Sequence, residues 1–189
     1  MAITFTKMNS QGNDFILIDL TKEELELSDD VISKIIKSVT TDFDQLLLID
    51  FEKNSESIFC QIFNSDGSRA YQCGNGLRAI MLYLNSEYSY SKISVDIEKR
   101  KYSVTIDEKK VITAYMGTPR AFKLINNNIS YLDSFEKQNV HINLIDHPIN
   151  FYLIELGNKH CVIVDECTST ITQCSVSYTH LTLPTRRFV

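Results

Sequence analysis

The segment from residue 73 to residue 84 limits the possible folds of this chain more than any other segment does. It opens with Cys73-Gly-Asn-Gly76 and continues as Leu77-Arg-Ala-Ile-Met-Leu-Tyr-Leu84, which predicts a helix that is apolar on nearly every side. A helix without a polar face should be enclosed by other elements, because its apolar side chains would otherwise meet water. We therefore expect a sheet to wrap around this helix.

Strand patterns on both sides of the helix can supply that sheet. Alternating apolar residues and turn signals predict strands at 3–8, 15–20, 45–52, 57–64, 94–97, 101–106 and 111–116. Within 57–64, the residues Ile58, Cys60 and Ile62 share one face, and Asn64 ends this core-facing row. A second helix is expected over 29–39, behind the cap residue Ser28. The combination predicts an α+β fold with a mixed or antiparallel sheet.

The best candidate for a domain boundary is Gly117-Thr-Pro-Arg120. Beyond it, strands are expected at 121–125, 140–145, 150–156 and 161–164, and a loop at 126–128. We therefore expect an N-terminal domain at 1–117 and part of a second domain at 118–174. Residues 175–189 have no convincing period and resemble translated sequencing-adapter read-through, so we treat them as a non-native tail.

Charge, length and cysteine content exclude several classes of function. The 19 basic and 24 acidic residues give a net charge of −5, and the absence of a basic stripe argues against a nucleic-acid partner. The apolar runs are too short to span a membrane and the N-terminus lacks a signal-peptide pattern, so we expect a cytoplasmic protein. Five cysteines without a CxxC pair indicate free thiols. No metal-ligand spacing is present, and we expect no metal and no cofactor.

Five of the six glycines lie in polar clusters that also contain asparagine and adjoin a predicted strand. An asparagine amide both donates and accepts hydrogen bonds, which suits the ammonium and carboxylate groups of a small amino-acid substrate. In the plainer alternative, each asparagine is a turn residue that satisfies its own backbone. The clusters are Gln11-Gly-Asn-Asp14, Asn64-Ser-Asp-Gly-Ser68, Cys73-Gly-Asn-Gly-Leu-Arg78 and Gly157-Asn-Lys-His160.

Cys73 is the most specific candidate for catalysis. It directly precedes the expected apolar helix, where unpaired N–H groups and the helix dipole favour an anion. A thiolate is therefore favoured there, and the same amides could hold a substrate carboxylate that approaches closely at Gly74 and Gly76. The alternative is a small buried cysteine in a helix cap. Cys60 and Cys161 lie in apolar strands and are expected to be structural.

Together, these motifs resemble those of the diaminopimelate epimerase family, which are cofactor-independent amino-acid isomerases of lysine and cell-wall biosynthesis. The resemblance implies two pseudo-symmetric domains and two cysteines, one of which removes the α-proton while the other returns a proton on the opposite face. The reaction would interconvert LL- and meso-diaminopimelate. Members of the family often dimerise, so the resemblance is compatible with a homodimer of the full-length protein. The matching segments, in the family's order, are 5–15, 42–46, 63–78, 116–117 and 157–162.

The resemblance also assigns roles to individual residues. Cys73 matches the first catalytic cysteine, and His160 matches a residue thought to tune the pair of thiols. The alternatives are a structural role for His160 and, for Gln45, an ordinary solvated amide at a strand end. The positions that match substrate contacts are Asn13, Gln45, Asn64, Gly74, Asn75 and Asn158.

One segment of the family pattern is missing. The family's second catalytic cysteine begins another Cys-Gly helix, which follows a Glu-Arg pair that binds the substrate carboxylate. Neither Cys167 nor Cys174 is followed by glycine. We therefore expect a truncated second domain, a full-length parent that is an epimerase, and a chain that is inactive or very weak by itself.

Other functions are weighed against this one. A racemase of another amino acid on the same fold is the hardest to exclude, because residues that would contact the distal end of the substrate are poorly represented. Proline-racemase-like enzymes carry His where this chain has Asn75, and PhzF-like isomerases use a carboxylate where it has Cys73, so both are disfavoured. A non-catalytic amino-acid-binding module, from a different class, would need no reactive thiol.

Overall fold

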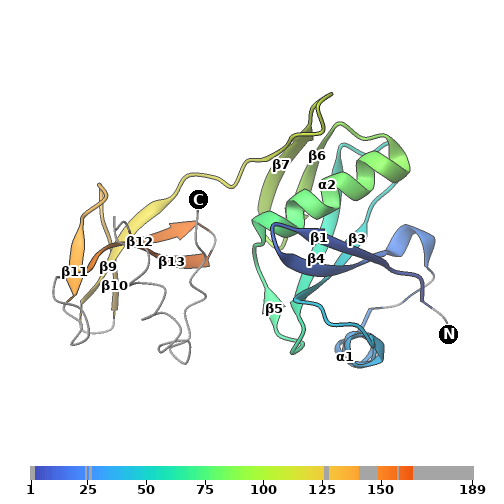
Figure 1. The fold of residues 1–189 in the computed structure, drawn as a ribbon, viewed down its shortest axis with the longest axis horizontal. Coiled ribbons are helices and arrows are strands. Elements are labelled where there is room, and N and C mark those ends of the chain that lie inside the picture. Colours follow the sequence, from blue (N-terminus) through green and yellow to red (C-terminus); the bar gives the residue numbers. More distant parts are fainter. Residues whose placement is uncertain are drawn as a thin grey trace. The chain divides into compact units, whose positions relative to one another are not determined.

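A computed structural model describes residues 3–23, 25, 27–125, 128–140, 149–156 and 158–163 of the chain. The chain forms two compact units, of which the first ends at Met116 and the second begins at Gly117 (Figure 1). Among the residues described, no helix has both the length and the apolar character needed to cross a membrane.

The first unit is built on one mixed sheet, which has eight strands within the described residues. Its strands follow the order β1-β2-β3-β4-β6-β7-β8, and β5 pairs with β4. The pairs β2–β3 and β4–β6 are parallel, and the other neighbouring pairs are antiparallel. The bounds are β1 Thr6–Ser10, β2 Asn13–Asp19, β3 Gln45–Asp50, β4 Ser57–Asn64, β5 Arg69–Ala70, β6 Lys92–Ile97, β7 Arg100–Ile106 and β8 Ile112–Ala114.

The apolar helix α2, Gly74–Tyr88, packs inside the curve of this sheet (Figure 1). It contacts β1 and β8, the strands at the two edges, as well as β2, β6 and β7. The predicted α+β fold with a sheet around the helix is therefore confirmed. The enclosure is less complete than the sequence suggested, because Arg78 is exposed and Leu82 is 44% exposed.

The opposite face of the sheet is covered by helix α1, Asp29–Ser38. Its first turn is capped by Ser28, whose Oγ accepts the Val31 N–H at 3.3 Å. Alternate residues of β2 and β3 face the two helices, so Leu47 packs with α2 while Leu46 packs with α1. Burial on both faces explains why these strands are continuously apolar instead of alternating.

A two-residue turn joins β1 to β2. Gln11 and Gly12 both have positive φ angles, 54° and 83°, which is the backbone geometry of a tight hairpin that matches the twist of its strands. β2 begins at Asn13, two residues before the strand predicted at 15–20, and Asn13 pairs with Ser10. The short 3₁₀ helix η1, Leu20–Lys22, follows β2.

The second unit holds a five-stranded sheet within the residues described. Its order is β10-β9-β12-β11, and β13 pairs with β12. The strand β10 begins at Asn128, where a loop was expected, because a four-residue strand beside a polar run gives little alternation to detect. The expected strand 140–145 falls almost wholly outside the described residues, as does the tail 175–189. The bounds are β9 Arg120–Ile125, β10 Asn128–Tyr131, β11 Gln138–Val140, β12 Ile149–Leu156 and β13 Asn158–Ile163.

Candidate functional site

Cys73 is the N-cap residue of α2. Its backbone is extended, with φ −151° and ψ 103°, and its Sγ accepts the N–H of Gly76 at 3.2 Å. Its carbonyl accepts the N–H of Leu77 at 2.9 Å, which is the first regular bond of the helix. The residue is only 1% exposed. The sulfur is therefore fixed at the positive end of the helix dipole, where negative charge is favoured.

Because Gly76 has no side chain, the Cys73 sulfur can lie close to the backbone of α2. A Cβ at this position would lie 3.3 Å from the Cβ of Cys73, 3.3 Å from Cδ2 of Leu47 and 3.4 Å from the sulfur. A Cβ at Gly74 would meet only the flexible end of Met116, at 3.5 Å or more. The glycine at 76 thus allows the thiol to pack closely between α2 and β3, whereas a side chain at 74 would meet only ordinary contacts.

Three candidate residues lie at one end of the sheet. Asn13 begins β2 and Gln45 begins the parallel strand β3, where Gln45 is the partner of Phe15. Asn64 ends the antiparallel strand β4 and lies directly opposite Gln45. Because β2 and β3 are parallel and β4 is antiparallel to β3, the starts of β2 and β3 and the end of β4 lie at the same end of the sheet. All three residues therefore lie there.

A chain of hydrogen bonds connects this end of the sheet to the start of α2. Asn75 Nδ2 donates to Asn13 Oδ1 at 2.8 Å, and Asn13 Nδ2 donates to Asp44 Oδ2 at 3.2 Å. At the other end, Arg78 Nη1 donates to Asn75 Oδ1 at 3.0 Å. These contacts bring together residues that lie 62 positions apart, and Asn75 is only two residues from Cys73.

A second amide pair lies on the neighbouring strands. The side chain of Gln45, 8% exposed, donates through Nε2 to Asn64 Oδ1 at 2.9 Å, and Asn64 Nδ2 donates to Ser68 Oγ at 2.9 Å. Asp66 accepts the N–H of Ser68 at 2.8 Å, and hydrogen bonds from Ser68, first from its side chain and then from its backbone, lower the pKa of Asp66. The β4–β5 turn therefore holds Asn64 in place.

The three described cysteines, Cys60, Cys73 and Cys161, are free thiols in different surroundings. Burial raises the pKa of the Cys60 thiol, and the nearby Cys73 raises it further. Burial also raises the pKa of Cys161, which is half-buried on β13. These two thiols therefore resist ionisation. Cys167 and Cys174 lie outside the described residues.

Asn158 and His160 belong to the second unit. Asn158 is the first residue of β13 and pairs with Leu156, while His160 is half-buried and pairs with Ile154. The contacts between candidate residues that the structure describes are those within the first unit, among Asn13, Gln45, Asn64 and Asn75.

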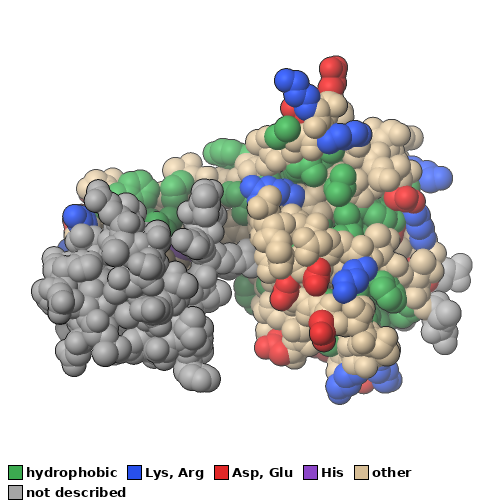
Figure 2. Space-filling model, in the orientation of Figure 1, with side chains coloured by type: hydrophobic (Ala, Val, Ile, Leu, Met, Phe, Trp, Pro, Cys, Tyr) green, Lys and Arg blue, Asp and Glu red, His purple; other side chains and the backbone are tan. Residues whose placement is uncertain are grey.

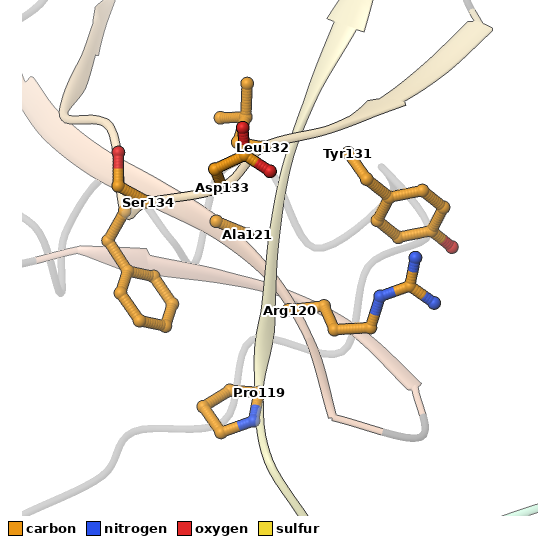
Figure 3. A pocket seen from close by; sticks show the side chains of 8 residues that line it. Pro119, Arg120, Ala121, Tyr131, Leu132, Asp133 and Ser134 are labelled. Atoms are coloured by element: carbon orange, nitrogen blue, oxygen red, sulfur yellow. The ribbon is translucent and has the colours of Figure 1, made fainter.

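A cavity of about 360 Å³ lies in the second unit (Figure 3). Arg120 extends over the ring of Tyr131, 3.7 Å from its centre, and the Tyr131 hydroxyl donates to Glu155 at 2.6 Å. None of the site residues predicted from the sequence lines this cavity. Its lining is Pro119, Arg120, Ala121, Tyr131, Leu132, Asp133, Ser134 and Phe135.

Two residues of the first-unit site were missed in the sequence, namely Asp44 and Arg78. Both lie in segments that match the family pattern, 42–46 and 63–78, and Arg78 is three residues from Asn75, which places two helical side chains together. Within the described part of the chain, no group of three or more His, Cys, Asp or Glu residues could hold a metal ion. The visible face of the first unit shows acidic and basic side chains scattered among apolar ones (Figure 2).

Comparisons with known proteins identify related sequences. A family model described as diaminopimelate epimerase matches residues 5–122. A diaminopimelate epimerase of Psychrobacter sp. (strain PRwf-1) is 33% identical over 168 residues, covering 86% of this chain and 57% of the relative. One from Legionella pneumophila (strain Corby) is 32% identical over 175 residues, covering 90% of this chain and 62% of the relative. The chain therefore spans 57–62% of the length of these curated relatives.

Solved structures support the fold. A phenazine biosynthesis protein of the PhzF family from Enterococcus faecalis aligns with a TM-score of 0.57 and 16% identity, over 92% of this chain and 61% of that one. A predicted epimerase from Pseudomonas aeruginosa aligns with a TM-score of 0.57 and 8% identity, over 91% of this chain and 67% of that one. At these identities the likeness shows a shared architecture.

Proposed function

Because this chain belongs to the diaminopimelate epimerase family, we propose that it supplies one catalytic half of an epimerase that interconverts LL- and meso-diaminopimelate. The reaction would serve the synthesis of lysine and peptidoglycan precursors. The observation that carries the proposal is the position of Cys73, whose sulfur caps α2 beside the Asn75–Asn13 hydrogen bond. This whole arrangement lies within the residues that the family model matches.

The start of α2 supports a role in binding the substrate carboxylate. The first N–H groups of a helix have no intrahelical acceptor. In α2 the N–H of Gly76 is taken by the thiol and that of Leu77 by the Cys73 carbonyl. The N–H groups of Gly74 and Asn75 remain for an anion. Fixed donors at this point stabilise the negative charge that spreads onto the carboxylate when the α-proton leaves.

Proton transfer then follows from the position of the thiol. In one direction of the reaction Cys73 donates the proton to the α-carbon, and in the reverse direction its thiolate takes the α-proton as the carbon–hydrogen bond breaks and the electron pair is delocalised into the carboxylate held at the helix start. Inversion requires a second acid–base group that exchanges a proton at the opposite face. Cys167 and Cys174 are not followed by glycine, so we propose that this chain alone lacks that group and is inactive or very weak.

The amides suit a substrate with an amino-acid group at each end. Asn13, Gln45 and Asn64 are uncharged and lie at one end of the sheet, where they can bind ammonium and carboxylate groups without a buried net charge. The family resemblance also implies that Asn158 is a substrate contact and that His160 tunes the thiols. The side-chain amides of Asn13, Gln45 and Asn64 therefore define the class of substrate that we propose.

Thiol reactivity tests the role of Cys73 in the chain itself. Cys60 and Cys73 are both 1% exposed, so burial alone predicts equal rates of alkylation by iodoacetamide. We expect Cys73 to react at least about tenfold faster near neutral pH, and diaminopimelate to slow it. The variants C60S and C73S assign the two rates by mass spectrometry. Equal rates would contradict an activated thiolate, and no protection by substrate would contradict binding of the substrate carboxylate at the start of α2 in this chain.

A chimera tests the reaction. Residues 1–116 of this chain are joined to the remainder of the Legionella pneumophila relative, and solvent deuterium at the α-carbon of LL-diaminopimelate is followed by NMR. We expect exchange that C73A abolishes. A chimera that melts cooperatively but exchanges no deuterium would contradict the epimerase assignment. Exchange with another amino acid, but not with diaminopimelate, would support a racemase of different specificity.

A further inference from the structure

An asparagine amide can occupy its place in two orientations, which exchange its oxygen and its NH₂ group. The two orientations have nearly the same shape, but they present opposite patterns of donor and acceptor. A site that binds a substrate through Asn13 and Asn75 therefore needs a means to select one orientation of each.

Asp44 selects the orientation at one end of the hydrogen-bonded chain. A carboxylate only accepts hydrogen bonds, and Asp44 Oδ2 accepts both Asn13 Nδ2 at 3.2 Å and the Asp14 N–H at 2.8 Å. The backbone of Asp44 is held as well, because its N–H donates to the Asp14 carbonyl at 2.8 Å and its carbonyl accepts the Ser65 N–H at 3.0 Å. The NH₂ group of Asn13 must therefore face Asp44, and its oxygen must face Asn75.

Arg78 selects the same orientation from the other end. A guanidinium only donates, and Arg78 Nη1 lies 3.0 Å from Asn75 Oδ1. The oxygen of Asn75 must therefore face Arg78, which turns its NH₂ group toward Asn13 Oδ1 at 2.8 Å. If either amide were reversed, oxygen would face oxygen or NH₂ would face the guanidinium.

The neighbouring amide pair provides a natural contrast. The chain from Gln45 through Asn64 leads to the hydroxyl of Ser68. The Ser68 hydroxyl donates in turn to the Asp66 carboxylate, so this chain has an acceptor-only group at one end, but the side chain at its other end, Gln45, is an amide that both donates and accepts. The chain through Asn13 and Asn75 differs from it. It has the acceptor-only Asp44 at one end and the donor-only Arg78 at the other.

We propose that Asp44 and Arg78 are positioning residues that lock the Asn13 and Asn75 amides in one direction and so set the donor pattern presented to the substrate. The inference rests on the proposed function for the identity of the substrate. The orientation itself depends only on the four side chains and their hydrogen bonds.

The test compares single and double variants. Either charged end alone can hold the chain in one direction, so D44A and R78A should each weaken diaminopimelate binding about threefold. The double variant D44A/R78A should weaken it at least about thirtyfold, more than the product of the single effects. R78K keeps a donor-only group and should bind nearly as tightly as the parent, whereas D44N, whose amide both donates and accepts, should weaken binding about as much as D44A. D50A changes the same residue type at the exposed far end of β3 and serves as the control.

NMR of the side-chain amides gives a readout that is independent of substrate. In the parent, the Asn13 NH₂ protons should show an NOE to the Asp14 amide proton, because both groups donate to one carboxylate oxygen. In D44A/R78A we expect two sets or broadened signals for Asn13 and Asn75, with an unchanged far-UV spectrum. Unchanged amide signals in the double variant, or binding losses that simply multiply, would overturn the positioning role. A parent protein and chimera that bind no diaminopimelate would instead overturn the proposed function, while the amide signals would still decide the orientation.

Discussion

The Tyr83 hydroxyl donates a hydrogen bond to the buried carboxylate of Asp19 at 2.9 Å and so joins α2 to the end of β2. Tyr88 donates to the same oxygen, and the other oxygen accepts both the N–H and the hydroxyl of Thr21, at 3.0 and 2.6 Å. Lys22 adds a hydrogen bond to the Tyr83 hydroxyl at 3.1 Å. This cluster anchors the end of α2 that lies farthest from the candidate site.

Removal of the Asp19 carboxylate should destabilise the first unit. The variant D19A leaves the buried hydroxyl of Tyr83 and the half-buried hydroxyl of Tyr88 without this acceptor, and we expect a loss of about 3 kcal/mol in the free energy of unfolding. Urea unfolding followed by circular dichroism measures this loss. D50A, at an exposed strand end, should change stability by less than about 0.5 kcal/mol. Equal effects of the two variants would contradict the role of the cluster.

Stability should also fall at alkaline pH. Burial raises the pKa of Tyr83 to about 12, and it raises the pKa of Tyr88 as well. An unfolded tyrosine ionises near pH 10, so between about pH 10 and 12 the unfolded chain binds fewer protons than the folded one. The stabilisation is therefore complete below pH 10 and is lost as the pH rises through this window. Unfolding midpoints of Y83F should depend less on pH there, whereas Y71F, at an exposed tyrosine, should follow the parent.

The two glycines at the start of α2 should respond differently to alanine. The change in helix propensity is similar at both positions, so the comparison isolates the contact made by the new Cβ. G76A forces the Cβ against Leu47 and Cys73, and it should be less stable than G74A by on the order of 1 kcal/mol. Thermal unfolding of both proteins measures the difference. If G76A were as stable as G74A, the close packing of the thiol would not be required.

The β1–β2 turn should tolerate asparagine better than alanine. Gly12 has a φ of 83°, and no atom lies within 4 Å of the point that a Cβ would occupy, so the cost of a side chain is conformational instead of steric. We expect G12A to lose about 1 kcal/mol and G12N to lose less, because asparagine adopts the left-handed region more readily. Urea unfolding of the two variants gives the order. A more stable G12A would contradict the turn geometry.

Much of the fold could be predicted from local patterns. The apolar stretch 77–84 predicted an enclosed helix, and the continuous apolar run Leu46–Ile49 belongs to a strand that is buried on both faces. Asn128 was assigned to a loop because strand β10 is short and is held by its pairing with β9, a contact that the local sequence does not record.

The candidate site was predictable by residue type but not by connection. Asn13, Asn64 and Asn75 stand out in short polar clusters that contain glycine, and these clusters are local in the sequence. The hydrogen bond between Asn13 and Asn75 depends on how the β1–β2 hairpin meets α2, which is a tertiary contact. Asp44 and Arg78 lie in the matching segments 42–46 and 63–78, but their hydrogen bonds to Asn13 and Asn75 follow only from that tertiary contact.

The two edge strands of the first sheet both touch α2, although β1 contains the unit's earliest strand residues and β8 its last. During synthesis, a nascent chain that has emerged only through Tyr88 would contain α2 but not β6, β7 and β8. The side of the helix that these strands contact would then be exposed to water. We expect the unit to fold in a single late step, after β8 has left the ribosome, since long-range pairing must precede most of the burial. The thiol of Cys73 would acquire its dry surroundings only then, so its position at the helix start would be completed at the same moment as the sheet that encloses it.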